Sequence, residues 1–229
     1  MNLPAELDRR PVRWSYTFLN LYEDICPHQA YRKYILRDIP YVESPAAKKG
    51  NDIHTALEHR VGGGKPLPPE MEAYEKFAVA FDGRKTAVEK KLGVTITGKA
   101  TGFFDQDCWG RGKADLTLVN GKVGYILDWK RGRMRDNPFE LEVQAMFLKC
   151  KYPTLQKIVG SYVWLKEDRI GQLHDLSDFR RTAEEIQQLV MLIERDKEAE
   201  KFEKRPGGLC SRWCEVTTCE HNGRYEPAK

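Results

Sequence analysis

The chain has 229 residues, of which 41% are hydrophobic and 31% charged, and its formal net charge is +4. This length suffices for one sizeable core, and the composition is that of a soluble globular protein with a heavily charged surface. No stretch approaches the roughly 18 apolar residues of a membrane span, and the N-terminus lacks the apolar core of a signal peptide. We therefore expect a cytoplasmic protein, from a bacterium or a phage-infected host, with no membrane partner.

The N-terminal part of the chain predicts a polar arm followed by helices. Residues 1–13 are polar and interrupted by prolines, so we expect a flexible arm there. Ser15 is placed to cap a helix over residues 16–26. A second helix is expected over residues 50–61, where His54 shares a face with apolar side chains. A histidine on an apolar face is most often a core residue, so its position alone does not predict a ligand.

A β-hairpin is predicted in the middle of the chain. After an amphipathic helix expected over residues 69–81, two β-rich runs flank Asn120-Gly121, and this dipeptide is typical of two-residue hairpin loops. With that loop, Asp115 lies opposite Ile126 on the neighbouring strand.

The two strands of this hairpin bring charged residues to one face. Side chains repeat on a face at every second residue, so Asp115, Asp128 and Lys130 fall on the same side of the sheet, whereas Leu127 and Trp129 point to the other. Two carboxylates and an ammonium together predict a site for a divalent cation beside a phosphate. The alternative is an exposed hairpin with scattered charges.

The C-terminal half predicts a helix after Asn137, with Gln144 within its apolar stripe. A glutamine in an apolar face needs hydrogen-bond partners. A strand over residues 158–165, a short antiparallel partner over 170–174 and a long helix capped by Ser177 follow.

The tail carries Cys210, Cys214, Cys219 and His221 within twelve residues. Three closely spaced cysteines in a cytoplasmic chain indicate thiolate ligation of a metal or cluster. Zinc could use these four residues alone, whereas a set in which Cys26 replaces the histidine would give four thiolates, suited to an iron–sulfur cluster. A tail without metal is a third possibility.

The sequence resembles a known nuclease family. Asp115 followed by Asp128-Trp129-Lys130 resembles the PD-(D/E)xK nuclease signature, particularly its RecB-like exonuclease branch. The resemblance extends to Cys26-Pro27 before a basic-aromatic run, to Gly50-x-x-x-His54 and to the helix that carries Gln144. It implies an α/β fold with a restriction-endonuclease-like core, in which helices flank a mixed central sheet. One domain would span residues 1–229, and its cysteine-rich segment 206–229 would pack on the N-terminal helix.

The resemblance also implies an activity, namely a metal-dependent DNA exonuclease that hydrolyses phosphodiester bonds from DNA ends in recombination, repair or phage DNA processing. His54, Asp115 and Asp128 would bind Mg²⁺ or Mn²⁺, and Lys130 and Gln144 would complete the catalytic set. The tyrosine that follows this glutamine in the family is replaced here by Leu148.

The iron–sulfur subgroup of the family places one cysteine near the N-terminus and three near the C-terminus. This layout favours a 4Fe–4S cluster on Cys26, Cys210, Cys214 and Cys219, with Zn²⁺ as the alternative. The tail spacing departs from the commoner C-x-x-C-x(5)-C pattern of that subgroup.

DNA is the expected partner. The candidates for contacts with its backbone are Arg131, Arg133 and Arg135, and those for stacking on unpaired bases are Tyr16, Tyr31 and Tyr34. The alternatives are a non-catalytic nucleic-acid-binding module on a nuclease fold and a zinc-stabilised interaction protein. The sequence leaves open the polarity of digestion, the preference for single or double strands, and the choice between exonuclease and endonuclease action. It also leaves open a homo-oligomeric state and a recombination partner protein.

Overall fold

The computed structural model of the chain describes residues 11–135 and 137–226, apart from the side chain of Glu89. The chain forms two compact units, Met1–Tyr41 with Glu184–Lys229 and Val42–Ala183, where the sequence predicts one domain. The predicted arm falls mostly outside the described residues, and at its end Val12 is buried. Across the described part of the chain, no helix is both long and apolar enough to cross a membrane.

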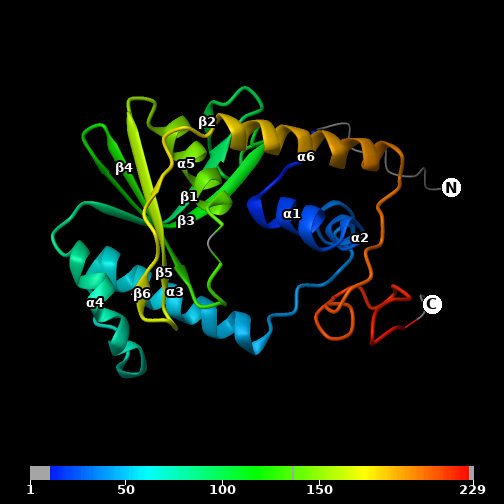
Figure 1. Cartoon of the computed structure of the whole chain (residues 1–229), viewed down its shortest axis with the longest axis horizontal. Coiled ribbons are helices and arrows are strands. Elements are labelled where there is room, and N and C mark those ends of the chain that lie inside the picture. The colour runs from blue at the N-terminus through cyan, green and yellow to red at the C-terminus, as the bar shows by residue number, and fades with distance from the viewer. Residues whose placement is uncertain (1–10, 136, 227–229) are drawn as a thin grey trace. The chain divides into compact units, whose positions relative to one another are not determined.

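The unit Val42–Ala183 is built on a mixed sheet, which has seven strands among the described residues (Figure 1). The strands are β1 (Thr86–Val94), β2 (Ala100–Thr101), β3 (Gly110–Asn120), β4 (Val123–Lys130), β5 (Lys157–Trp164), β6 (Arg169–Ile170) and β7 (His174–Asp175). Their order is β2-β1-β3-β4-β5-β6, and β7 also pairs with β5. The β4–β5 pair is parallel and the others are antiparallel. A parallel pair needs a crossover connection, which a helix between β4 and β5 supplies here.

The helices are α1 (Tyr16–Asn20), α2 (Pro27–Ala30), α3 (Pro45–Gly63), α4 (Glu75–Ala78), α5 (Phe139–Lys151) and α6 (Arg180–Glu198). Turns of π-helix follow α1 at Leu21–Ile25 and α2 at Tyr31–Leu36. Turns of 3₁₀-helix flank α4 at Pro69–Tyr74 and Val79–Phe81, so the helix predicted over residues 69–81 is interrupted.

Two apolar clusters cover the two faces of the sheet. On one face, Ile126 of β4 packs with Leu141 and Leu148 of α5. On the other, Trp129 of β4 packs with Ile53 of α3. Figure 1 shows these two helices on separate sides of the sheet. The opposite orientations of Trp129 and Ile126 confirm the alternation predicted for β4.

Two helix starts differ from the prediction. α3 begins at Pro45, five residues early, because the Ser44 hydroxyl accepts a hydrogen bond from the amide of Ala47 at 3.1 Å and so caps the helix. α6 begins at Arg180, whose amide bonds to Asp178 at 3.2 Å rather than to Ser177. The predicted cap at Ser15 is confirmed by a bond from the amide of Phe18 at 3.3 Å.

The hairpin loop lies one residue later than predicted. Asn120 pairs with Val123, so the loop is Gly121-Lys122, and Thr117 rather than Asp115 lies opposite Ile126. Gly121 has a φ of 57°, and a glycine at the first loop position is typical of a type II′ turn. The correction moves each pairing by two residues, which leaves the face of every side chain unchanged.

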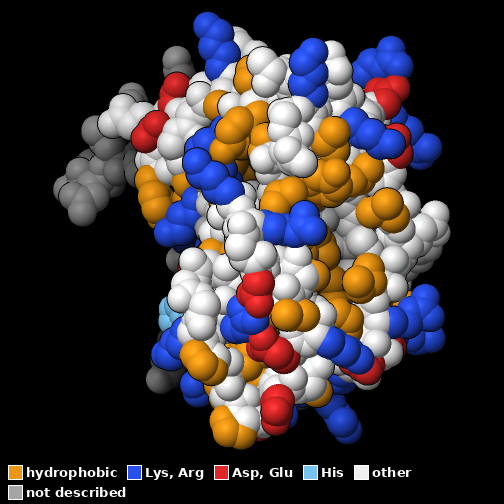
Figure 2. Space-filling view, turned by 90° about the vertical axis from the view of Figure 1, so that its left-hand side faces the viewer, with side chains coloured by type: hydrophobic (Ala, Val, Ile, Leu, Met, Phe, Trp, Pro, Cys, Tyr) orange, Lys and Arg blue, Asp and Glu red, His pale blue; other side chains and the backbone are white. Residues whose placement is uncertain are grey.

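Figure 2 shows the face seen from the left of Figure 1, where hydrophobic side chains lie among Lys and Arg side chains. Single hydrophobic residues scattered over a surface are normal, whereas exposed hydrophobic residues that lie together indicate a binding surface.

Candidate active site in the central sheet

Asp115 lies where β3 and β4 stop pairing. The ladder between these strands runs from Asn120 to Leu116, which pairs with Leu127. Beyond that pair, the amide of Trp129 donates to Asp115 Oδ2 at 2.9 Å, so a carboxylate takes the place of a backbone acceptor. This bond fixes the Asp115 side chain against β4 at the point where the strands separate.

α3 brings His54 to the same place. Its Nδ1 lies 3.2 Å from Asp115 Oδ1. Burial lowers the pKa of His54, but the hydrogen bond to Asp115 and the negative charges of Asp115 and Asp128 outweigh burial, so the pKa is raised above its ordinary value. The histidine is therefore a partner of the acidic site rather than a core residue.

Asp128 is buried between two side chains, with 3% of its surface exposed. Gln144 of α5 donates from Nε2 to Asp128 Oδ1 at 3.0 Å, and Lys130 Nζ lies 2.6 Å from Oδ2. Burial raises the pKa of Asp128 above its ordinary value, against the lowering effect of the Lys130 charge. Burial also acts to lower the pKa of Lys130, but the Asp128 and Glu140 carboxylates outweigh it and raise that pKa.

Glu140 is a site residue that the sequence analysis missed. Its Oε2 lies 2.7 Å from Lys130 Nζ, so the ammonium sits between two carboxylates. Glu140 lies four residues before Gln144 on α5, a spacing that puts both on one face of the helix. That spacing was the signal available in the sequence.

The structure thus places the five predicted catalytic residues in two groups: His54 contacts Asp115, and Gln144 and Lys130 both contact Asp128, whose pKa the charge of Asp115 helps to raise. Among the described residues, no three His, Cys, Asp or Glu side chains take the arrangement of a metal site. The chemistry of the donor set nevertheless suits a divalent ion, because the set contains two carboxylates and an imidazole. Gln144 Oε1 is also buried without a hydrogen-bond partner, which is energetically unfavourable. A bound ligand that donates a hydrogen bond to this oxygen would remove the penalty.

A second candidate centre lies in the unit formed by the chain ends. A cavity of about 390 Å³ is lined by residues that include Cys26, Cys210, Cys214, Cys219 and His221. Burial, with further contributions from the three other thiols, raises the pKa of Cys214. The structure therefore places the N-terminal cysteine with the three of the tail, and it places the histidine there too.

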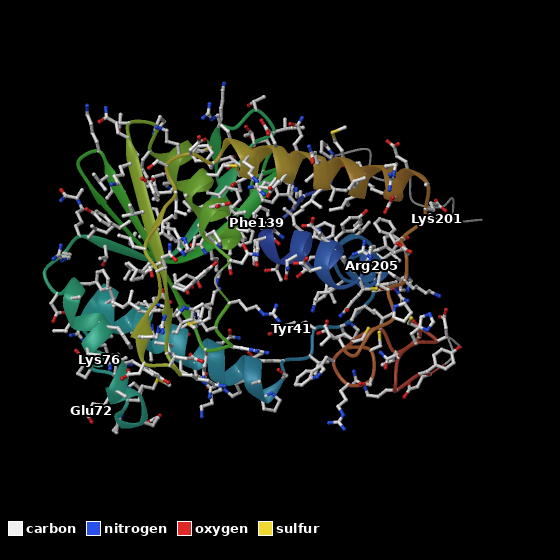
Figure 3. All side chains as sticks on the ribbon, viewed as in Figure 1. Tyr41, Glu72, Lys76, Phe139, Lys201 and Arg205 are labelled. Atoms are coloured by element: carbon white, nitrogen blue, oxygen red, sulfur yellow. The ribbon has the colours of Figure 1, made fainter. Side chains whose placement is uncertain are left out.

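Hydrogen bonds to backbone carbonyls hold the segment that leads into the tail against residues 23–28. The amide of His28 donates to the carbonyl of Glu203 at 3.0 Å, and the Arg205 guanidinium donates to the carbonyl of Glu23. Figure 3 shows Arg205 on the segment that leads from α6 into the tail. These bonds bring the cysteines of both chain ends to one place.

Two of the three tyrosines expected to stack on bases, Tyr31 and Tyr34, stack on phenylalanine rings instead. Tyr31 stacks on Phe202 with ring centroids 4.3 Å apart, and Tyr34 stacks on Phe18 at 4.9 Å. Both rings are used in packing within their own unit. In contrast, Arg133 and Arg135 are exposed on the loop after β4, as a contact with a phosphate backbone requires.

Comparisons with known proteins establish the fold. No family model matches the chain, and no curated protein matches it. Among solved structures, it is similar to a provisionally assigned exonuclease from Eubacterium rectale, with a TM-score of 0.55, 12% identity and coverage of 100% of this chain and 95% of that one. It is also similar to SSO0001, with a TM-score of 0.52, 16% identity and coverage of 93% and 87%. At these identities the likeness shows a shared α/β fold.

Proposed function

We propose that this protein is a metal-dependent DNA exonuclease of the RecB-like type. The observation that carries the proposal is the convergence of Asp115, Asp128 and Lys130 where β3 and β4 separate, with His54 and Gln144 in contact with the two acids. The likeness in fold to a provisionally assigned exonuclease supports it.

The ligands proposed for Mg²⁺ or Mn²⁺ are His54, Asp115, Asp128 and the carbonyl of Trp129. When bound, the ion would polarise the scissile phosphate and lower the pKa of a water. The contact between His54 and Asp115 would open to admit it.

The remaining site residues act on the water and the phosphate. Lys130 is held by two carboxylates, which keep its ammonium charged and aimed at the site, where it would stabilise charge that develops on the phosphate. Gln144 holds Asp128 through Nε2, and its unpartnered Oε1 can accept a hydrogen bond from the attacking water. Arg131, Arg133 and Arg135 would contact the DNA backbone without reading its sequence.

For the tail we propose a 4Fe–4S cluster on Cys26, Cys210, Cys214 and Cys219. The presence of Cys26 at the cavity supports this set, because zinc held by the tail and His221 alone has no need of it. The free thiols fit a reducing compartment such as the cytoplasm.

The test is digestion of end-labelled linear DNA with Mg²⁺ or Mn²⁺. We expect wild type to shorten the DNA from its ends, chelator to stop the reaction, and Asp128→Asn to slow it by at least about a hundredfold. Covalently closed circular DNA should stay intact, which separates an exonuclease from an endonuclease.

The matched control is Asp168→Asn. Asp168 is exposed and pairs with Lys76, and its φ of 54° is one that asparagine also adopts. This variant should digest DNA as wild type does. A folded, metal-loaded wild type that binds DNA without cutting it would favour the non-catalytic binding module instead.

A further inference from the structure

A short loop just before the start of β3 carries two adjacent aromatic rings, one half-buried and one exposed. Residues 102–109 connect β2 to β3, and Phe104 in this loop is 71% exposed. Phe103 lies beside it, with ring centroids 5.0 Å apart and planes at 72°. Phe103 is half-buried, whereas Phe104 is presented to solvent and has no role in the core of the unit.

Each ring is paired with a cation from the sheet. Lys91 Nζ of β1 lies 5.3 Å from the centre of the Phe104 ring, and Arg111 Cζ of β3 lies 5.0 Å from that of Phe103. Lys113, which is also exposed, pairs in register with Lys91. Two positive charges therefore lie beside the rings, and a third, that of Lys113, lies opposite Lys91 on the neighbouring strand.

The loop is held in shape by its own hydrogen bonds. Asp105 accepts from the amide of Gly102 at 2.7 Å and from the hydroxyl of Thr101 at 3.0 Å, and the same hydroxyl donates to Asp107 at 2.7 Å. These bonds engage both acids of the loop. The rings are thus presented by an ordered loop, which lowers the entropy lost when a ligand stacks on them.

This surface lies in line with the candidate active site. From Asp115 back toward the start of β3, Lys113 and then Arg111 lie at every second residue, and the four residues from Asp115 to Arg111 span about 13 Å. Cations suit phosphates, and exposed aromatic rings stack on unpaired bases, which a duplex keeps in its interior. The combination fits a single strand better than it fits a duplex.

We propose that Phe103, Phe104, Lys91, Arg111 and Lys113 form a platform for single-stranded DNA that leads to Asp115. This inference rests on the proposed nuclease function, which makes DNA the substrate. It adds that the DNA reaches the active site as an unpaired strand. Bases would stack on Phe104, while the three cations would contact the phosphates.

The experiment measures binding without cleavage. The chain in chelator is titrated into fluorescein-labelled oligothymidine and into a duplex of the same length, and anisotropy gives the Kd. We expect Phe104→Ala to weaken single-strand binding about tenfold and duplex binding less than about twofold. Phe104→Trp should restore single-strand affinity.

Two further variants sharpen the test. Leu173→Ala removes a side chain of similar exposure, 66%, from the segment between β6 and β7 and should change neither Kd. Lys113→Ala should reduce the dependence of log Kd on log salt by about 0.7, the value for one phosphate contact on a single strand.

The outcomes separate this inference from the nuclease proposal. Unchanged single-strand affinity in Phe104→Ala, or equal losses on both DNAs, would overturn the platform even if wild type digests DNA. A selective loss in Phe104→Ala would support it even if digestion fails. A loss of the same size in Leu173→Ala would also count against it.

Discussion

At the scale of single residues, the least expected contact is that between Glu140 and Lys130. A lysine with only Asp128 beside it could swing away, whereas two carboxylates at 2.6 and 2.7 Å fix its ammonium from two sides. Because Glu140 acts through Lys130, it is a positioning residue and not a catalytic one.

We therefore expect Glu140→Gln to lower kcat for DNA digestion by about 10- to 100-fold and to leave KM nearly unchanged, since a misplaced lysine affects the reacting phosphate more than it affects binding. Thermal unfolding should be close to wild type. Glu142→Gln is the control, because Glu142 lies on the same helix but bonds to Thr182. Equal rates for Glu140→Gln and wild type would show that Asp128 alone holds the lysine.

The prediction that Asp115 and Asp128 share a face does not depend on where the hairpin turns, because a two-residue shift in pairing changes no face. The ladder itself ends at Leu116, one residue short of Asp115. Glu140 was not predictable in the same way, because a glutamate in the first turn of a helix already has an ordinary explanation in the helix dipole. Nor does the sequence reveal that Phe104 is exposed, since a phenylalanine is more often buried.

At the scale of elements, glycines decide where the hairpin turns and how firmly α3 forms. Gly121 has a φ of 57° at the β3–β4 loop, whereas Gly50 lies inside α3 with open space around the position of a Cβ. The same substitution should therefore have opposite effects at the two sites.

We expect Gly121→Ala to lower the free energy of unfolding by about 1 kcal/mol, because L-residues are strained at this φ. Gly50→Ala should raise it by about 0.5–1 kcal/mol, because alanine loses less entropy in a helix. Urea denaturation followed by circular dichroism gives both values. Destabilisation by Gly50→Ala would mean that the helix is packed more tightly there than the structure shows.

At the scale of the whole molecule, the net charge of +4 is too small to favour nucleic-acid binding by itself, so the DNA binding that we propose depends on local clusters of charge. The candidate ligands of the cysteine centre come from both ends of the chain, from position 26 and from positions 210–219. The prediction that Cys26 shares a centre with the tail rests on a resemblance, since no local pattern joins Cys26 to the tail.

A cluster that joins distant parts of a chain should stabilise the unit that contains them, because ligand binding by the folded state adds to the free energy of unfolding. We expect protein purified without oxygen to contain iron and sulfide and to absorb visible light, and Cys26→Ala to lose all three and to melt at a lower temperature. Cys150→Ala is the matched control, since Cys150 is on α5, outside the cysteine cavity, and it should retain them. Zinc that remains stoichiometric in Cys26→Ala would instead assign the tail to Cys210, Cys214, Cys219 and His221, because only that set can bind metal without Cys26.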